Sequence, residues 1–433
     1  MTQTTIHHRA LPGLGLRLCA LTLVLTAVPP AAATAQETPE QLARRVLSTT
    51  PLFDGHNDLP WAIRENEDHP RDVRAYDLRR TTTGHTDIQR LRDGMVGAQF
   101  WSVYIPMAAV EEGAAKVQLE QMDIALQVFE RYPDVFGVAT STSDVNRVFG
   151  EGRIASVMGM EGGHAIQNSL GALRAFYALG ARYMTLTHSG NNDWADSATD
   201  DPVHGGLTEF GREVVREMNR LGMLVDLSHT SPETMHDALD VAEAPVIFSH
   251  SSARGVTDHP RNVPDDVLRR LPENGGVVMV TFVPSFINDE VRDWGRLSPE
   301  EREGRTPPRA TMDDVIRHIE HIRDVAGIDH VGIGSDFDGI SSVPLGLEDV
   351  STFPALFTEL ARRGWSESDL RKLAGENVLR VWREAEAAAR RIQRLRGPST
   401  ATIEELDGPV MEQSAGLSAR SGALRTHGGA PQG

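Results

Sequence analysis

Short apolar runs alternate with longer amphipathic segments along most of this chain. Eight of the runs have the length and composition of strands, at residues 52–58, 96–105, 154–160, 182–187, 223–227, 245–248, 276–283 and 330–334. Apolar residues recur at helical spacing at residues 39–47, 117–132, 169–179, 207–221, 263–271, 312–326, 353–362, 367–373 and 376–394, and Ser231 begins a further helix. Eight strands alternating with helices predict an α/β protein, a (β/α)8 TIM-like barrel with a lead-in helix and C-terminal helices. A doubly wound open sheet is the alternative, because a strand is easily miscounted from sequence.

The sequence divides into three predicted segments: a signal peptide, a barrel domain and a tail. Arg9 and Arg17 precede an apolar run at 18–28, and small residues follow at 33–35. This pattern predicts a signal peptide over residues 1–35, cleaved near Ala35, and a protein exported to the periplasm or secreted. Residues 36–396 form the predicted barrel domain. Residues 397–433 are rich in Gly, Ser and Ala without apolar periodicity, which predicts a flexible tail.

The composition argues against several classes of binding partner and of catalytic chemistry. The formal net charge is −18, which argues against nucleic acid and anionic membrane surfaces. The single cysteine, Cys19, lies within the predicted signal, so we expect neither a disulfide nor a thiol nucleophile in the exported protein. No GxSxG motif or phosphate loop is found. The sequence leaves open whether the barrel forms a homodimer.

Polar side chains of the kind that bind metals recur where the predicted strands end. They are His56, Asp58, Glu161, His188, His229, His250 and Asp336. In a closed parallel barrel the carboxyl ends of all strands meet on one face, where the active sites of this fold lie. We therefore expect these residues, far apart along the chain, to converge on one site.

Four imidazoles and three carboxylates suit two Zn²⁺ ions better than one. A natural division gives one ion His56 and Asp58, gives the other His229 and His250, and lets Glu161 bridge them. Such a pair can hold a bridging hydroxide at neutral pH and polarise a carbonyl. We therefore predict amide hydrolysis by this hydroxide.

The remaining polar residues suit supporting roles. Asp336 would take the proton of the water and pass it to the leaving amine, and His188 would stabilise negative charge on the attacked oxygen. Arg261 suits either a substrate carboxylate or an ordinary surface position. Less favoured candidates are placed as loop or supporting residues (His164, His204, His259 and Asp226) or on a solvated helix face (His318 and His321).

Seven motifs carry a resemblance to a known family. They read DGHNDLP (54–60), EGGHAI (161–166), RYMTLTHSGNNDWADS (182–197), VDLSHTS (225–231), PVIFSHSSAR (245–254), RNVPDD (261–266) and GIGSDFDG (332–339). In content and order they resemble the membrane (renal) dipeptidase family of zinc metallopeptidases, over residues 52–381.

The resemblance implies a (β/α)8 barrel with two zinc ions that hydrolyses dipeptides, some of them with a C-terminal D-residue. Certain members of that family also open β-lactam rings. Matched motif by motif, it implies His56 and Asp58 on one zinc, His229 and His250 on the other, and Glu161 between them. It also implies that His188 and Arg261 contact substrate and that Asp336 is the acid/base.

This chain departs from the mammalian members in two ways. It has neither their disulfides nor a lipid anchor, which predicts a soluble exported form. Phe286 stands where those members contribute a tyrosine, which leaves the side-chain preference open. The sequence has two alternative interpretations. One is a related binuclear metal amidohydrolase acting on non-peptide amides, lactams or lactones, and the other is a barrel that only binds a ligand. The second would predict a broken set of metal ligands, whereas the set here is intact.

Overall fold

The computed structural model describes residue 7 and residues 37–409. Eight parallel strands close into a barrel, as predicted; they are β1 (Leu52–Asn57), β2 (Val96–Ser102), β4 (Ile154–Glu161), β5 (Ala181–Thr185), β6 (Leu224–Asp226), β7 (Ile247–Ser251), β8 (Val277–Val280) and β9 (Val331–Ile333). Closure comes from the pairing of β1 with β9 and of β2 with β4. The doubly wound alternative is therefore wrong.

A ninth strand, β3 (Phe136–Val138), was not predicted. It pairs with the first residues of β4, Ile154 to Ser156, whereas β5 pairs with β4 from Met158 onward. Three residues with a central glycine carry too little pattern to be recognised from sequence.

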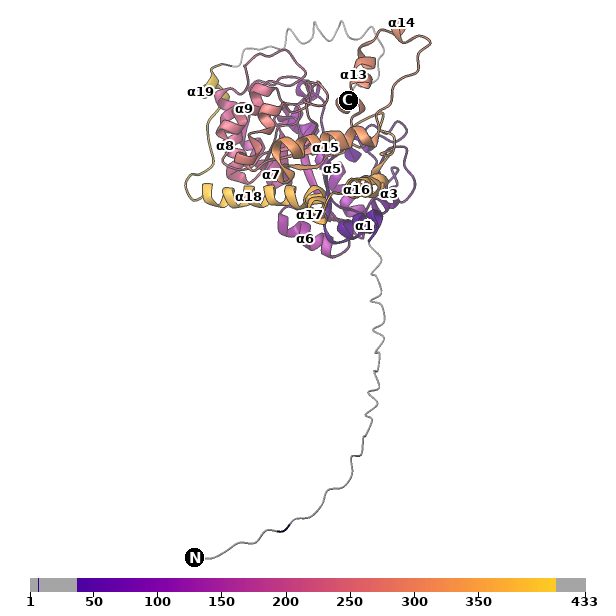
Figure 1. Cartoon of the computed structure of the whole chain (residues 1–433). Helices are drawn as coiled ribbons and strands as arrows, with labels where there is room; N and C mark the ends of the chain where they lie inside the picture. Colours follow the sequence, from indigo (N-terminus) through magenta and orange to yellow (C-terminus); the bar gives the residue numbers. More distant parts are fainter. Residues whose placement is uncertain (1–6, 8–36, 410–433) are drawn as a thin grey trace, which may run out of the picture. The chain divides into compact units, whose positions relative to one another are not determined.

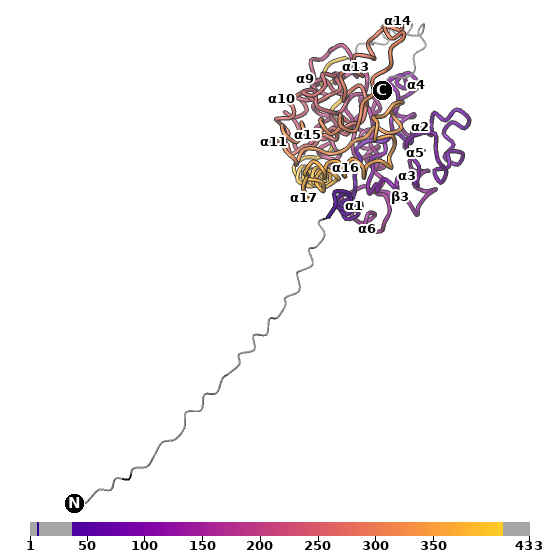
Figure 2. The backbone as a smooth tube through the Cα atoms, turned by 45° about the vertical axis from the view of Figure 1, so that its right-hand side comes forward, coloured from indigo at the N-terminus to yellow at the C-terminus, as the bar shows by residue number. Residues whose placement is uncertain are grey.

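Helices surround the strands. They are α1 (Pro39–Thr49), α2 (Leu59–Arg64), α3 (Ile88–Asp93), α4 (Ala109–Glu112), α5 (Ala114–Arg131), α6 (Thr142–Gly150), α7 (Leu170–Ala178), α8 (Glu209–Leu221), α9 (Pro232–Val241), α10 (Asp265–Leu268), α11 (Leu271–Asn274), α12 (Pro284–Ile287), α13 (Asp289–Arg296), α14 (Pro299–Arg302), α15 (Met312–Ala326), α16 (Phe353–Arg362), α17 (Glu367–Arg371), α18 (Asn377–Ile392) and α19 (Ile403–Asp407). Figure 1 and Figure 2 both show α1 beside α16 and α17. The helix expected at 263–271 is instead the separate α10 and α11, because Pro272 cannot continue a helix and begins a new one.

The barrel interior is apolar and closed at one end. Along β4, Ala155 and Val157 belong to the interior cluster, whereas Met158 and Met160 pack in the larger cluster with the surrounding helices, as strand alternation requires. Helix α18, the long yellow helix at the lower left of the folded part in Figure 1, adds Trp382 to the interior cluster. The ring centroids of Trp382 and Phe100 are 6.0 Å apart. Polar side chains are thereby left to the opposite end of the strands.

Part of the predicted tail is packed against the barrel domain. Ile403 is 3% exposed, and the Asp407 carboxylate accepts hydrogen bonds from the Thr208 hydroxyl (2.7 Å) and the Phe210 amide (3.2 Å) at the start of α8. The prediction of a flexible segment from residue 397 is therefore wrong for this part. Residues 410–433, the predicted cleavage site and, apart from residue 7, the predicted signal lie outside the described residues. Within residues 37–409, no helix is both long and apolar enough to cross a membrane.

His318 corrects another expectation. It is fully buried instead of solvated: Nδ1 accepts a hydrogen bond from the Ala253 amide (3.0 Å), and Nε2–H donates to the carbonyl of Ile287 (3.2 Å). His321 is partly exposed and pairs with Asp265 at 2.8 Å. Burial lowers the pKa of His318 to about 3. The apolar residues of α15 dictate this position, because the turn that carries His318 also carries Ile319 and Val315 into the core.

We therefore expect His318 to contribute to acid destabilisation. Its imidazole binds a proton readily when unfolded but only near pH 3 when folded, so stability is lost as the pH falls below about 6.5. Relative to the wild type, the free energy of unfolding of His318→Gln should rise by roughly 3 kcal/mol as the pH is lowered from 7.5 to 4. Urea unfolding across this range measures the difference. His321→Gln, which removes a partly exposed imidazole from the same helix, is the matched control; equal trends in both variants would contradict the assignment.

Candidate metal centre

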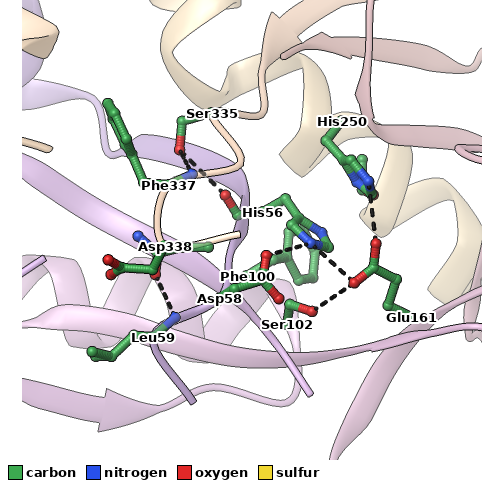
Figure 3. Close-up of polar contacts among 12 residues, drawn as sticks. His56, Asp58, Leu59, Phe100, Ser102, Glu161, His250, Ser335, Phe337 and Asp338 are labelled. Carbon is green, nitrogen blue, oxygen red and sulfur yellow. Dashed lines mark hydrogen bonds and ion pairs between the residues drawn. The ribbon is translucent and has the colours of Figure 1, made fainter. Parts of the chain in front are cut away.

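The seven predicted strand-end residues come together at the open end of the barrel. Figure 3 shows Glu161 between His56 and His250, with Asp58 on the far side of His56. Three groups of potential ligand atoms each lie within 4.8 Å of one another: His56 with Glu161 and His250, Glu161 with His188 and His229, and His56 with Asp58 and Asp336. All seven residues belong to at least one group.

Two one-residue bulges aim two of the imidazoles. From Asp54 to Asn57, β1 advances three residues while β2 advances two, and from Phe248 to Ser251, β7 does the same against β8. A bulge shifts the in–out alternation of a strand by one residue. Phe53 and Ile247 thus point into the interior, and so do His56 and His250, which an unbroken strand would turn outward.

Glu161, the last residue of β4, is the centre of the cluster. Its Oε2 lies 3.4 Å from His56 Nε2 and accepts a hydrogen bond from the Ser102 hydroxyl (3.2 Å). Its Oε1 lies 3.0 Å from His229 Nε2 and 3.3 Å from His250 Nε2. The two carboxylate oxygens therefore face two different sets of side chains.

The two sets differ in chemistry. On one side, His56 Nε2 lies 3.1 Å from Asp58 Oδ2, and the Asp336 amide donates to the His56 carbonyl at 3.1 Å. On the other side, the Nε2 atoms of His229 and His250 are 2.9 Å apart. His229 and Asp336 both have left-handed backbones, with φ of +68° and +70°. Non-glycine residues adopt this conformation at a cost, so the surrounding structure must hold both in place.

His188 and Arg261 line the same site. His188 Nε2 lies 3.8 Å from Glu161 Oε1. Arg261 is only 3% exposed, its Nη1 has no hydrogen-bond partner among the described residues, and its guanidinium lies 5.3 Å from the centre of the Phe286 ring. The Phe286 ring stacks on His259 at 4.2 Å. A buried guanidinium with a free N–H is suited to an anionic ligand, which favours the substrate role over the surface position.

The electrostatics keep two imidazoles neutral. Burial holds the pKa values of His229 and His250 well below their usual range, although Glu161 opposes this. Burial alone would raise the pKa of Glu161, but the neighbouring His56, His229 and His250 lower it well below its ordinary value. Neutral imidazoles beside an ionised carboxylate are the protonation states that metal binding requires.

The pKa values of His56 and Asp336 are instead raised, whereas that of Arg261 is lowered. Burial would lower the pKa of His56, yet Tyr183, Asp58 and Glu161 together raise it well above 6.5. Burial, Asp58 and Glu161 raise the pKa of Asp336 well above its usual value, against His56 and Arg261. Burial lowers the pKa of Arg261 to about 10. Negative charge thus exceeds positive charge around His56, which would favour a cation there.

The donor set fits divalent metal ions. Three buried atoms of the candidate ligands have no hydrogen-bond partner among the described residues: His56 Nε2, Asp58 Oδ1 and His229 Nδ1. The Nε2 atoms of His229 and His250 face each other, so at least one lone pair has to be shared with a proton or a cation. Imidazole and carboxylate ligands are typical of zinc and similar ions.

Sequence reasoning missed several residues that contact this cluster. Tyr183 Oη lies 2.8 Å from His56 Nδ1, and Ser249 Oγ lies 2.8 Å from His250 Nδ1. A tyrosine inside a strand looks like an ordinary core residue, so Tyr183 gave no signal. Ser249 directly precedes a candidate ligand, which was the available clue. Of the lesser candidates, His164 is buried beside the site, and His204 Nε2–H donates to the Asn192 carbonyl at 2.9 Å.

The chain is similar to known proteins over most of its length. The family model described as membrane dipeptidase (peptidase family M19) matches residues 40–396. An uncharacterized dipeptidase of Schizosaccharomyces pombe is 48% identical over 364 residues, covering 81% of this chain and 84% of the relative.

Two solved structures are also similar. The probable dipeptidase PvdM of Pseudomonas aeruginosa is 27% identical with a TM-score of 0.70, over 81% of this chain and 99% of that one. A metallopeptidase of Rhodobacter sphaeroides, bound to a phosphinate mimic of the dipeptide L-Ala-D-Ala, is 29% identical with a TM-score of 0.68, over 78% of this chain and 99% of that one. With the family match over most of its length and a metal-suited site at the barrel mouth, the chain belongs to the membrane dipeptidase family, peptidase family M19, and is a metal-dependent dipeptidase.

Proposed function

We propose that the chain hydrolyses dipeptides with two zinc ions. His56 and Asp58 would hold one ion, His229 and His250 the other, and Glu161 would bind both. The observation that carries this assignment is the position of the Glu161 carboxylate, with Oε2 toward His56 and Oε1 toward His229 and His250. A bound metal pair supplies Lewis acidity and a nucleophilic oxygen at neutral pH.

The side chains around the ligands would handle substrate and protons. Asp336, whose raised pKa favours holding a proton, would accept the proton of the attacking water and deliver it to the leaving amine. His188, close to Glu161 but with its side chain 17% exposed, would donate a hydrogen bond to the carbonyl oxygen as it gains charge.

Arg261 would anchor the C-terminal carboxylate of the substrate. Its buried position and its unpaired Nη1 support this role. An anchor beside the reacting centre leaves room for one residue after the scissile bond, so we propose that longer substrates are excluded.

The class of substrate has one alternative. A related binuclear amidohydrolase would act on non-peptide amides, lactams or lactones through the same metal pair. The similarity to the Rhodobacter sphaeroides structure favours the dipeptide, because its ligand mimics L-Ala-D-Ala. We propose on this ground that dipeptides with a C-terminal D-residue are among the substrates. The predicted signal peptide supports the further proposal that the enzyme acts after export. Rates of hydrolysis over a panel of L,L- and L,D-dipeptides, lactams and lactones distinguish a dipeptidase from an amidohydrolase that acts on non-peptide substrates.

Removing a metal ligand should abolish both metal binding and hydrolysis. We expect the purified enzyme to hold about two equivalents of zinc and to lose activity on chelation. His229→Ala should lose at least one equivalent and at least about 10³-fold in kcat/KM, roughly 4 kcal/mol. Elemental analysis and dipeptide kinetics measure both. His236→Ala, on the outer helix α9, is the control and should keep both. Wild-type zinc content and turnover in His229→Ala would refute the assignment.

Arg261 should set the requirement for a free carboxylate. Arg261→Met should lower kcat/KM for a dipeptide about 10²-fold, roughly 3 kcal/mol, because the carboxylate loses a buried charged partner. The same change should barely affect the corresponding dipeptide amide, so the ratio of the two kcat/KM values is the measurement. Arg261→Lys keeps the charge without the planar guanidinium, so its ratio should lie between those of the wild type and Arg261→Met. An unchanged ratio would argue against the anchor.

A further inference from the structure

A chain of hydrogen bonds leads away from His250 into the barrel wall. His250 Nδ1 lies 2.8 Å from Ser249 Oγ, and Ser249 Oγ lies 2.6 Å from Asp226 Oδ2. All three residues are almost completely buried. The chain therefore begins at a candidate ligand and ends on a carboxylate that solvent does not reach.

Asp226 receives four hydrogen bonds. Its Oδ1 accepts from the amides of Ser228 (3.1 Å) and Ser249 (2.8 Å), and its Oδ2 accepts from the hydroxyls of Thr185 (2.6 Å) and Ser249 (2.6 Å). A carboxylate can only accept, and a hydroxyl has one proton to donate. The proton of Ser249 is therefore directed to Asp226 and is not available to His250.

This direction fixes the tautomer of His250. Because the Ser249 hydroxyl has given its proton to Asp226, its oxygen has to accept from His250, which places a proton on Nδ1. The neutral ring then carries a lone pair on Nε2, which lies 3.3 Å from Glu161 Oε1 and faces the candidate metal site. His229 has no such support, since its Nδ1 has no hydrogen-bond partner among the described residues.

We propose that Asp226 and Ser249 are positioning residues that hold His250 in the tautomer able to bind a metal. The proposal rests on the proposed function, in which His250 is a zinc ligand. It concerns residues that do not themselves touch metal or substrate. Outer partners of this kind orient ligand imidazoles, and their loss typically costs 10–100-fold in metal affinity.

Asp226→Asn gives a specific test, because it should reverse the chain. The amide oxygen would accept from the two backbone N–H groups, and the amide nitrogen would replace Oδ2 and donate to Ser249. The Ser249 hydroxyl would then turn its proton toward His250 Nδ1. The proton of His250 would move to Nε2, where it would obstruct the metal.

The experiment uses the full-length apoprotein and zinc. Zinc affinity is measured by competition with a chromophoric chelator, and the tautomer of His250 by ¹⁵N NMR of labelled histidine. We expect Ser249→Ala and Asp226→Asn each to weaken zinc binding by about 10–100-fold. In Asp226→Asn the resonance should also change from a protonated Nδ1 to a protonated Nε2.

Thr185→Val is the matched control. It removes the other hydroxyl that donates to Asp226 Oδ2 at the same 2.6 Å but has no contact with His250, so its zinc affinity should stay within about threefold of the wild type. Equal losses in Thr185→Val and Ser249→Ala, or an unchanged tautomer in Asp226→Asn, would overturn the proposal. If Ser249→Ala does not fold, the tautomer of His250 in Asp226→Asn tests the proposal by itself. A wild type that binds no zinc would instead refute the proposed function itself.

Discussion

The structure depends on a single buried carboxylate that has to be compensated from several strands. Glu161 ends β4 inside the barrel mouth, almost without contact with solvent. An isolated buried charge is costly, and three imidazoles from β1, β7 and the segment after β6 lie within 3.4 Å of its oxygens. The same arrangement leaves lone pairs and unpaired atoms facing inward, which is where divalent cations would be stabilised.

Two further buried carboxylates are hydrogen-bonded to residues that adjoin this site. Asp54 on β1 accepts from both the amide and the hydroxyl of Ser335 at 2.7 Å, and Asp226 on β6 accepts from both the amide and the hydroxyl of Ser249. Each serine directly precedes a site residue, Asp336 in one case and His250 in the other. Each pair also joins neighbouring elements, β1 to the segment after β9 and β6 to β7. Burial raises the pKa of Asp54 to about 6, although these donors oppose the shift.

The division of the barrel into an apolar floor and a polar mouth follows from packing. Phe53 and Phe100 stack in the apolar half of the barrel, with 4.7 Å between their ring centroids, and Trp382 packs against both at a tilted angle. Such a closely packed floor holds the strands in a fixed register. Ligand groups at the strand ends are then positioned by rigid elements, which is the condition for a precise metal centre. The left-handed backbones of His229 and Asp336 are held in place by this framework.

The sequence by itself determined the eight strands, their alternation with helices and the seven polar residues at the strand ends. These follow from local pattern, because strand and helix periods are written in neighbouring residues. The tertiary structure alone decided the bulges that turn His56 and His250 inward, the burial of His318, the docking of Ile403 and the short strand β3. Each of these depends on atoms brought close from distant parts of the chain: the bulges on pairing with the next strand, His318 on Ala253 and Ile287, and α19 on the start of α8. Local periodicity contains no information about partners that are distant along the chain. The sequence therefore predicted which residues form the site, and only the fold determined which of their atoms are in contact.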